Sequence, residues 1–166
     1  MKIAYEYVKI PNNDFVLLCS LLDEYLNDIV GGEIQRSQYL QYNLTDNIHD
    51  IVIAYEIKEG EKIPVGCGSF KRYIPEEGEG NLKETAEIKR MFIKEELRGY
   101  GIGKEILSVL ENKAKEQAFR KIILETGRPL VAAMKLYMKF GFHIINNYGQ
   151  YKDMKDVYKR QVRRLC

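Results

Sequence analysis

The sequence predicts a single domain of the α/β class, of the α+β type, built around one core. Apolar residues alternate between a period of two and a period near 3.6 along the chain. A β-branched run at 51–57 and a second strand-like run at 65–73 flank the turn-like segment 59–62 and predict a hairpin. A glycine-rich turn at 98–103 separates a strand-like run from a long helix-like run. The 166 residues are enough for one ordinary core, whereas two full domains would be cramped.

The first half of the chain predicts a strand, two helices and the hairpin. Pro11 closes the first strand, and Gly31-Gly32 ends the helix that follows it. The expected elements are a strand over 3–10, a helix over 15–29, a shorter helix over 37–44, and hairpin strands over 51–57 and 65–73.

The second half predicts two further helices and two or three strands. Pro129 suits the first turn of the last helix, and Gly141 suits its C-terminal cap. The expected elements are a strand over 86–93, a helix from the glycine turn to about 117, a strand over 121–125, the helix between Pro129 and Gly141, and an irregular β region over 142–145. Residues 155–166 are basic and predict a tail, although Val157 and Val162 leave room for a short strand.

Composition restricts the classes of partner and compartment. With 26 basic and 24 acidic side chains the formal charge is +2, so no broad field draws the chain to nucleic acid or membrane. The three scattered cysteines, Cys19, Cys67 and Cys166, indicate free thiols in a reducing compartment. The first residues have no apolar stretch of the secretory kind, which indicates a cytoplasmic protein.

The glycine turn at 98–103 predicts an anion site. Glycines allow close approach of backbone, and the first turn of the following helix presents unpaired N–H groups, an arrangement that favours phosphate. Two common phosphate loops do not fit. A mononucleotide P-loop needs Gly and Ser/Thr where Arg98 and Glu105 stand, and a dinucleotide fingerprint needs a glycine where Lys104 stands.

Three blocks in order and spacing carry a resemblance. Arg98, Gly101 and Gly103 fit the pattern Arg/Gln-x-x-Gly-x-Gly/Ala; the strand-like run 86–93 precedes it, and the runs 122–127 and 133–142 follow. Over residues 87–142 the chain resembles the GNAT superfamily of N-acetyltransferases. The resemblance implies a central mixed, mostly antiparallel sheet with a V-shaped splay between strands four and five, flanked by about four helices.

The implied activity is acetyl transfer from acetyl-CoA to a primary amine by direct attack in a ternary complex, without a metal. One departure concerns the cofactor: many members carry Asn where Leu130 stands, so Thr126 or Arg128 would have to replace that contact. The residues expected to bind acetyl-CoA are Met91, Phe92, Ile93, Arg98, Gly99, Tyr100, Gly101, Ile102, Gly103, Lys104 and Thr126.

The resemblance implies two catalytic residues. Glu87 stands where several members place a general base, with a solvated carboxylate or a substrate-binding charge as the alternative and Glu125 as a weaker competitor. Tyr137 matches a tyrosine often placed to protonate the departing CoA thiolate, with an ordinary core residue as the alternative.

The acceptor stays open at this level. An acidic loop containing Glu76, Glu77 and Glu79 would suit a cationic amine, small or peptidic, and does not separate amino acid, polyamine, aminoglycoside and protein acceptors. Two alternatives belong to other classes: a non-catalytic acyl-CoA sensor, and a nucleic-acid-associated protein acting through the basic tail, which the near-neutral charge disfavours. A homodimer is compatible with the sequence.

Overall fold

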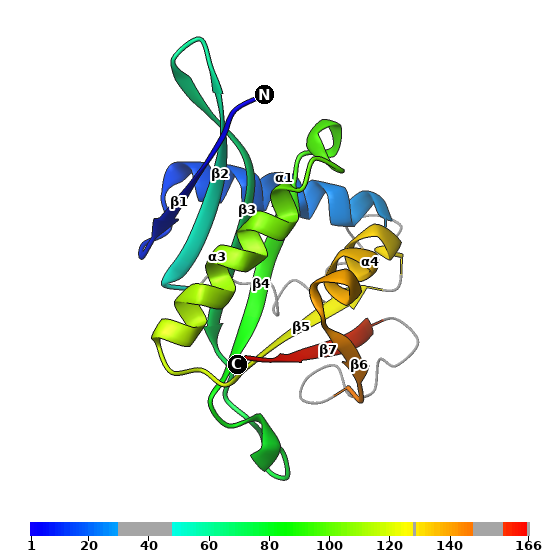
Figure 1. The fold of residues 1–166 in the computed structure, drawn as a ribbon. Coiled ribbons are helices and arrows are strands. Elements are labelled where there is room, and N and C mark those ends of the chain that lie inside the picture. The colour runs from blue at the N-terminus through cyan, green and yellow to red at the C-terminus, as the bar shows by residue number, and fades with distance from the viewer. Residues whose placement is uncertain (30–47, 128, 148–157, 166) are drawn as a thin grey trace. The chain divides into compact units, whose positions relative to one another are not determined.

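The computed structural model describes residues 1–29, 48–127, 129–147 and 158–165 (Figure 1). The element order expected from the sequence is confirmed in these ranges up to residue 145, while the helix expected over 37–44 lies outside them. The strands and helices are β1 (Ile3–Val8), α1 (Asn13–Ile29), β2 (Asp50–Lys58), β3 (Glu61–Arg72), β4 (Thr85–Ile93), α3 (Ile102–Glu116), β5 (Lys121–Gly127), α4 (Val131–Phe140), β6 (His143–Ile145) and β7 (Tyr158–Arg164). Among the described helices, none combines the length and apolarity needed to cross a membrane.

The strands form one sheet of seven in the order β1-β2-β3-β4-β5-β7-β6. The β1–β2, β2–β3, β5–β7 and β6–β7 pairs are antiparallel, and β4 and β5 are parallel. The parallel register joins Thr85, Ala86 and Glu87 to Lys121, Ile122 and Ile123. This mixed, mostly antiparallel sheet confirms the expected fold class.

The basic segment near the C-terminus is a strand and not a tail. Residues 158–164 form β7, which pairs with β5 on one side and with β6 on the other. Only Val162 is apolar between Lys159 and Arg164, so the strand is specified by its two neighbours more than by its own residues.

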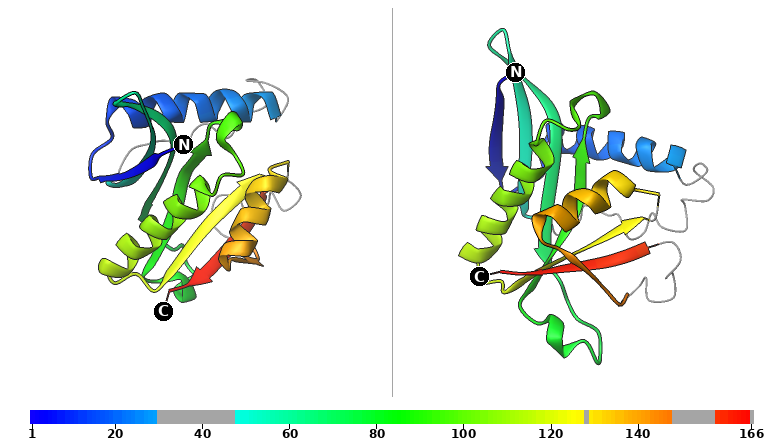
Figure 2. Two further views of the ribbon diagram at one scale, coloured as in Figure 1. Left: turned by 45° about the horizontal axis from the view of Figure 1, so that its top comes forward. Right: turned by 45° about the vertical axis from the view of Figure 1, so that its right-hand side comes forward.

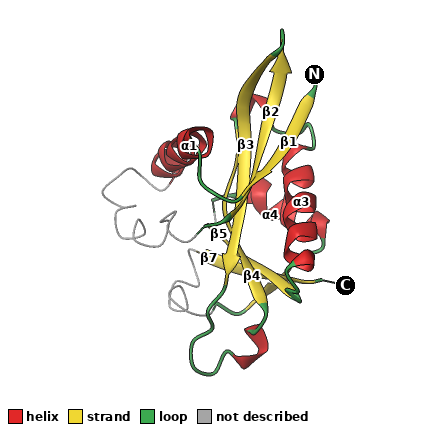
Figure 3. Cartoon of the chain, turned by 90° about the vertical axis from the view of Figure 1, so that its left-hand side faces the viewer, coloured by secondary structure: helices red, strands yellow, loops and turns green. Residues whose placement is uncertain are grey.

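Residues 1–70 and 89–110 form one compact unit, in which α1 and α3 cover opposite faces of the sheet (Figure 3). Phe15, Leu18 and Leu22 of α1 pack with Ile51, Ile53, Cys67 and Phe92 in a buried core. On the other face a Cβ at Gly68 would lie 2.7 Å from Ile106 and 3.0 Å from Leu110, both of α3. The missing side chain lets α3 approach the sheet closely.

Residues 71–88 and 111–166 form the second unit. Its core contains Leu82, Ile123 and Val162, with Tyr73 and Ile145 packed against them. Helix α4 lies alongside the β5–β7 strands (Figure 2) and ends at Gly141, which adopts the left-handed conformation with φ 104°. The sequence predicted this cap correctly.

Candidate active site

After β4 the chain forms a short 3-10 helix at Glu95–Leu97, and the glycine turn then leads into α3. Gly99 and Gly101 have φ values of 87° and 84°, in the left-handed region that favours glycine. A Cβ at either position would meet no atom within 4 Å, so the space above the turn is open. The first helical bond runs from Glu105 N to Gly101 O at 3.2 Å. Helix geometry therefore leaves the N–H groups at the start of α3 available to an anion.

Arg98 contacts the end of β4 and helix α1. Its Nε donates to the carbonyl of Ile93 at 3.0 Å, and its guanidinium lies 4.4 Å from the ring centroid of Tyr25 on α1. These contacts make Arg98 a support of the loop. Lys104 and Tyr100 are exposed at the rim, while Gly103 is buried in the first turn of α3.

The backbone at the end of β4 has two edges. Lys94 N donates to Val65 O of β3 at 2.9 Å, and Phe92 O lies beside Gly66 of the same strand. Because N–H and C=O groups alternate between edges, those of Met91 and Ile93 point away from β3. The side chain of Phe92 is packed in the core beneath α1. Of the residues expected to bind acetyl-CoA, Phe92 therefore has a structural side chain.

Glu87 is buried on β4, with 5% of its surface exposed, which excludes the alternative of a solvated strand carboxylate. Its register partner is Ile123 of β5. Since strand residues alternate between faces, Glu125 lies on the same face as Ile123 and Glu87. Glu125 is less buried than Glu87. The two carboxylates weighed from the sequence therefore share one face of the sheet.

Tyr137 is buried in α4 with 6% of its surface exposed. Its ring meets that of Phe142 edge-on at 5.9 Å, and Phe142 N donates to the Tyr137 carbonyl at 3.0 Å. Burial raises the pKa of the Tyr137 phenol far above its usual value of 10.0. The phenol therefore keeps its proton at any ordinary pH and can donate that proton or a hydrogen bond.

Thr126 of β5 is buried beside a partner that the sequence analysis missed. The Nε2 of Gln161, on β7, donates to Thr126 Oγ1 at 3.1 Å, and both residues are buried. Gln161 stands in the segment expected to be a basic tail, where only the weak signals of Val157 and Val162 indicated a strand. Arg128, the other suggested replacement for the missing asparagine, lies outside the described residues.

The acidic loop differs from the expectation for Glu79. Its carboxylate is buried and accepts hydrogen bonds from Tyr73 Oη and Glu76 N, both at 2.8 Å. The loop also reaches the start of β5, where Lys121 Nζ donates to Asn81 O. Glu79 is therefore a structural group, and Glu76 and Glu77 are the exposed carboxylates of this loop.

Two of the three cysteines lie together in the core beneath α1. Cys19 and Cys67 are free, buried thiols, and Cys166 lies outside the described residues. Within the ranges that the structure covers, no three His, Cys, Asp or Glu side chains gather in a way that could hold a metal ion.

The sequence matches a family of known proteins and several individual relatives. Residues 18–142 match the description "Acetyltransferase (GNAT) family". An IAA acetyltransferase of Azospirillum brasilense is 32% identical over 142 residues, which cover 85% of each protein. An uncharacterized N-acetyltransferase of Dictyostelium discoideum is 38% identical over 74 residues, 45% of this chain and 34% of that protein, so the chain spans about a third of that relative's length.

Solved structures share the fold. A Klebsiella pneumoniae protein described as an acyl-CoA N-acyltransferase aligns with a TM-score of 0.72 at 22% identity, covering 99% of this chain and 98% of the other. A Bacillus subtilis acetyltransferase in complex with CoA aligns with a TM-score of 0.64 at 20% identity, covering 99% and 100%. The sequence match over most of the chain is decisive: this chain belongs to the acetyltransferase (GNAT) family.

Proposed function

We propose that this protein transfers an acetyl group from acetyl-CoA to a primary amine. The observation that carries the proposal is the glycine turn before α3, with two left-handed glycines and open space above them. In a chain of this family such a turn is suited to the pyrophosphate of CoA, because several N–H groups can donate to the same oxygens. The fold shared with a CoA-bound B. subtilis acetyltransferase supports the choice of cosubstrate.

Six residues of the predicted binding set contact the cofactor directly in the proposal. The N–H groups of Ile102, Gly103 and Lys104 donate to the pyrophosphate, and Lys104 adds positive charge at the rim. The outward N–H and C=O groups of Met91, and the N–H of Ile93, pair with the amides of the pantetheine arm. Thr126 contributes a hydroxyl on β5, which Gln161 holds in place.

Glu87 and Tyr137 supply the proton transfers. Glu87, directly or through water, takes a proton from the acceptor's ammonium group, which must be neutral before it attacks the thioester carbonyl. Tyr137 donates a hydrogen bond or its proton to the sulfur on which negative charge develops as the C–S bond breaks. The buried phenol is suited to this task because it stays protonated.

The experiment is a panel of amines with acetyl-CoA, read by release of CoA thiol and by mass spectrometry of the acceptor. The panel contains an amino acid, a polyamine, an aminoglycoside and peptides with a free N-terminus or a lysine. We expect thiol release that requires one amine class and equals its acetylation. Calorimetric binding of acetyl-CoA without transfer to any amine would instead identify a sensor and refute the enzymatic proposal.

A further inference from the structure

Arg163 of β7 contacts α4 and the part of α3 that belongs to the second unit, residues 111–116. Its Nη1 donates to the carbonyl of Phe140, the last residue of α4, at 2.5 Å, and its guanidinium lies 5.0 Å from the centroid of the Phe140 ring. Its Nε donates to Glu111 Oε2 of α3 at 3.0 Å. A single guanidinium thus binds the end of one helix and the side of another.

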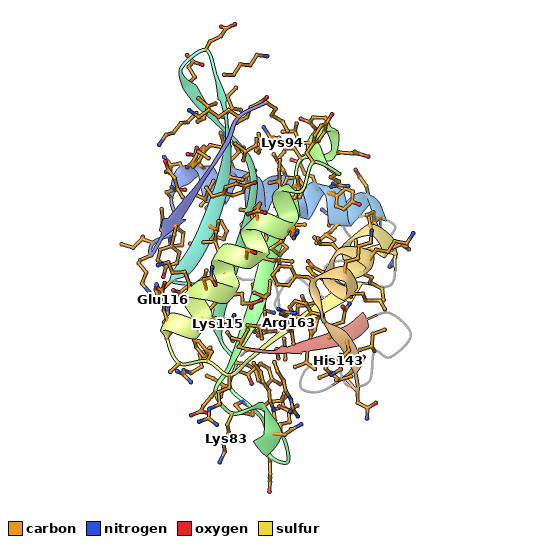
Figure 4. All side chains as sticks on the ribbon, viewed as in Figure 1. Lys83, Lys94, Lys115, Glu116, His143 and Arg163 are labelled. Carbon is orange, nitrogen blue, oxygen red and sulfur yellow. The ribbon has the colours of Figure 1, made fainter. Side chains whose placement is uncertain are left out.

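The surroundings of Arg163 leave little freedom. Glu111 is almost fully buried and also receives Lys115 Nζ at 2.6 Å. A Cβ at Gly141 would lie 2.1 Å from Arg163 Nη1, so a side chain at the cap would displace the guanidinium from this position. Figure 4 shows Arg163 on β7 and Lys115 on α3. Arg164, the next residue, is exposed and lies on the other face of the strand.

The helix end that Arg163 binds is the one that fixes Tyr137. Gly141 N donates to Met138 O at 3.1 Å and Phe142 N donates to Tyr137 O at 3.0 Å, so the cap and the following residue close the last turn. The ring of Phe142 then packs on the ring of Tyr137. A shift of the cap would move both the carbonyl and the ring contact of Tyr137.

We infer that Arg163 is a positioning residue: it holds the last turn of α4 against α3 and β7 and thereby fixes the phenol of Tyr137 for acetyl transfer. This inference rests on the proposed function of Tyr137. An exposed ion pair contributes little to stability. Here the guanidinium of Arg163 binds a nearly buried carboxylate and a carbonyl at a helix end at the same time. Lysine keeps the charge but lacks the planar, fixed arrangement of donors, so it should hold the two contacts less well.

The first experiment tests the cap without using activity. Hydrogen exchange of the backbone amides at Gly141 and Phe142 is compared in Arg163→Met, Arg163→Lys and the matched control Arg164→Met. We expect exchange in Arg163→Met to be faster by roughly tenfold or more, a smaller increase for lysine, and no change in the control. Wild-type protection in Arg163→Met would overturn the inference whatever the enzyme does.

The second experiment asks whether Arg163 acts through Tyr137. Arg163→Met should lower kcat roughly tenfold with a change in the KM for acetyl-CoA of less than about twofold. Combined with Tyr137→Phe, it should cause no further loss, since the phenol it positions is gone. Multiplicative losses in the double variant, or full kcat in Arg163→Met beside an impaired Tyr137→Phe, would overturn the inference. Full kcat in Tyr137→Phe would refute the proposed role of the phenol and, with it, the catalytic part of this inference, while the exchange data would still report on the cap.

Discussion

The guanidinium of Arg90, on β4, donates to both carboxylate oxygens of Asp23, on α1, at 3.0 and 3.1 Å. Arg90 has a φ of 57°, a left-handed conformation that is strained for a residue with a side chain. A third hydrogen bond, to Cys19 O at 2.9 Å, also ties this side chain to α1. The contacts offset the strain and fix α1 to the sheet in the first unit.

Replacing Asp23 with Ala should destabilise the fold, because it leaves the charge of Arg90 buried without its carboxylate. The side chain of Arg90 is 4% exposed and that of Asp23 is 37% exposed. Solvent around Asp23 weakens the pair, so we expect a loss of about 2 kcal/mol in the free energy of unfolding, below the usual range for buried pairs. Urea unfolding measures it, and Glu24→Ala, an exposed neighbour on α1, is the control. Equal losses in both variants would contradict a specific role for the pair.

The role of the glycine turn can be tested with two glycine substitutions that introduce the same backbone strain, one inside the turn and one outside it. Gly101→Asp and Gly60→Asp both place a side chain at a left-handed position, with φ of 84° and 85°, where a Cβ meets no other atom. Each should cost about 1–2 kcal/mol of stability. Only Gly101→Asp should also weaken binding of CoA, by about 100-fold or more, because a carboxylate then faces the pyrophosphate. Calorimetry with CoA measures the difference, and equal affinities would place the cofactor elsewhere.

Removal of the Tyr137 hydroxyl should slow turnover while leaving cofactor binding intact. We expect Tyr137→Phe to lower kcat by about 10-fold or more, with the KM for acetyl-CoA nearly unchanged. Because burial raises the pKa of this phenol, its deprotonation should not limit activity in the wild type at any pH up to about 10. Steady-state kinetics across this range tests both points. A loss of wild-type activity that follows phenol ionisation near neutral pH would be inconsistent with a buried donor.

Replacement of Glu87 with Gln should change the pH profile as well as the rate. Without a base, the acceptor must lose its proton to bulk water, so kcat/KM should fall by about 100-fold near neutral pH and recover toward alkaline pH. Glu125→Gln is the matched control, since this carboxylate lies on the same face of the sheet. A stronger effect in Glu125→Gln than in Glu87→Gln would reverse the assignment of the base.

The carboxyl group of Glu111 should make the free energy of unfolding depend on pH in the acidic range. Burial alone would raise its pKa, but hydrogen bonds from Lys115 and Arg163 outweigh burial and hold the pKa of this carboxyl below its ordinary value of 4.5. A lowered folded-state pKa stabilises the fold above the unfolded value, and this stabilisation is lost as the pH falls through the folded value. Glu111→Gln should therefore be less stable than wild type by about 1–2 kcal/mol at pH 7, and the gap should narrow below about pH 4.5. Urea unfolding at several pH values measures the gap, and one that stays constant would contradict the linkage.

The local patterns of the sequence were sufficient for most of the elements and for the glycine turn. Gly101 and Gly141 could be predicted because each adopts a left-handed conformation that glycine favours. Helix α3 could be predicted because its apolar period is visible in the sequence without knowledge of the sheet it packs on. The roles of Gln161 and Arg163 could not be predicted, because they depend on contacts with residues that are distant in the sequence. Their strand contains Lys159, Arg160 and Arg164, and it forms because β5 and β6 offer a ladder and Glu111 neutralises Arg163. Likewise, the burial of Glu79 depends on Tyr73 and on the fold of its loop, which charge alone could not indicate.

The place of β7 in the sheet has a consequence for biosynthesis. β7 follows in chain order the two strands between which it lies, β5 and β6. A nascent chain that has emerged only as far as β6 therefore presents one edge of β5 without its antiparallel neighbour, and an open edge with Ile122 and Leu124 beside it invites pairing with other chains. Folding of the second unit is thus expected to be completed late, after release of residues 158–164, and premature termination before them should yield aggregates in place of a smaller soluble protein.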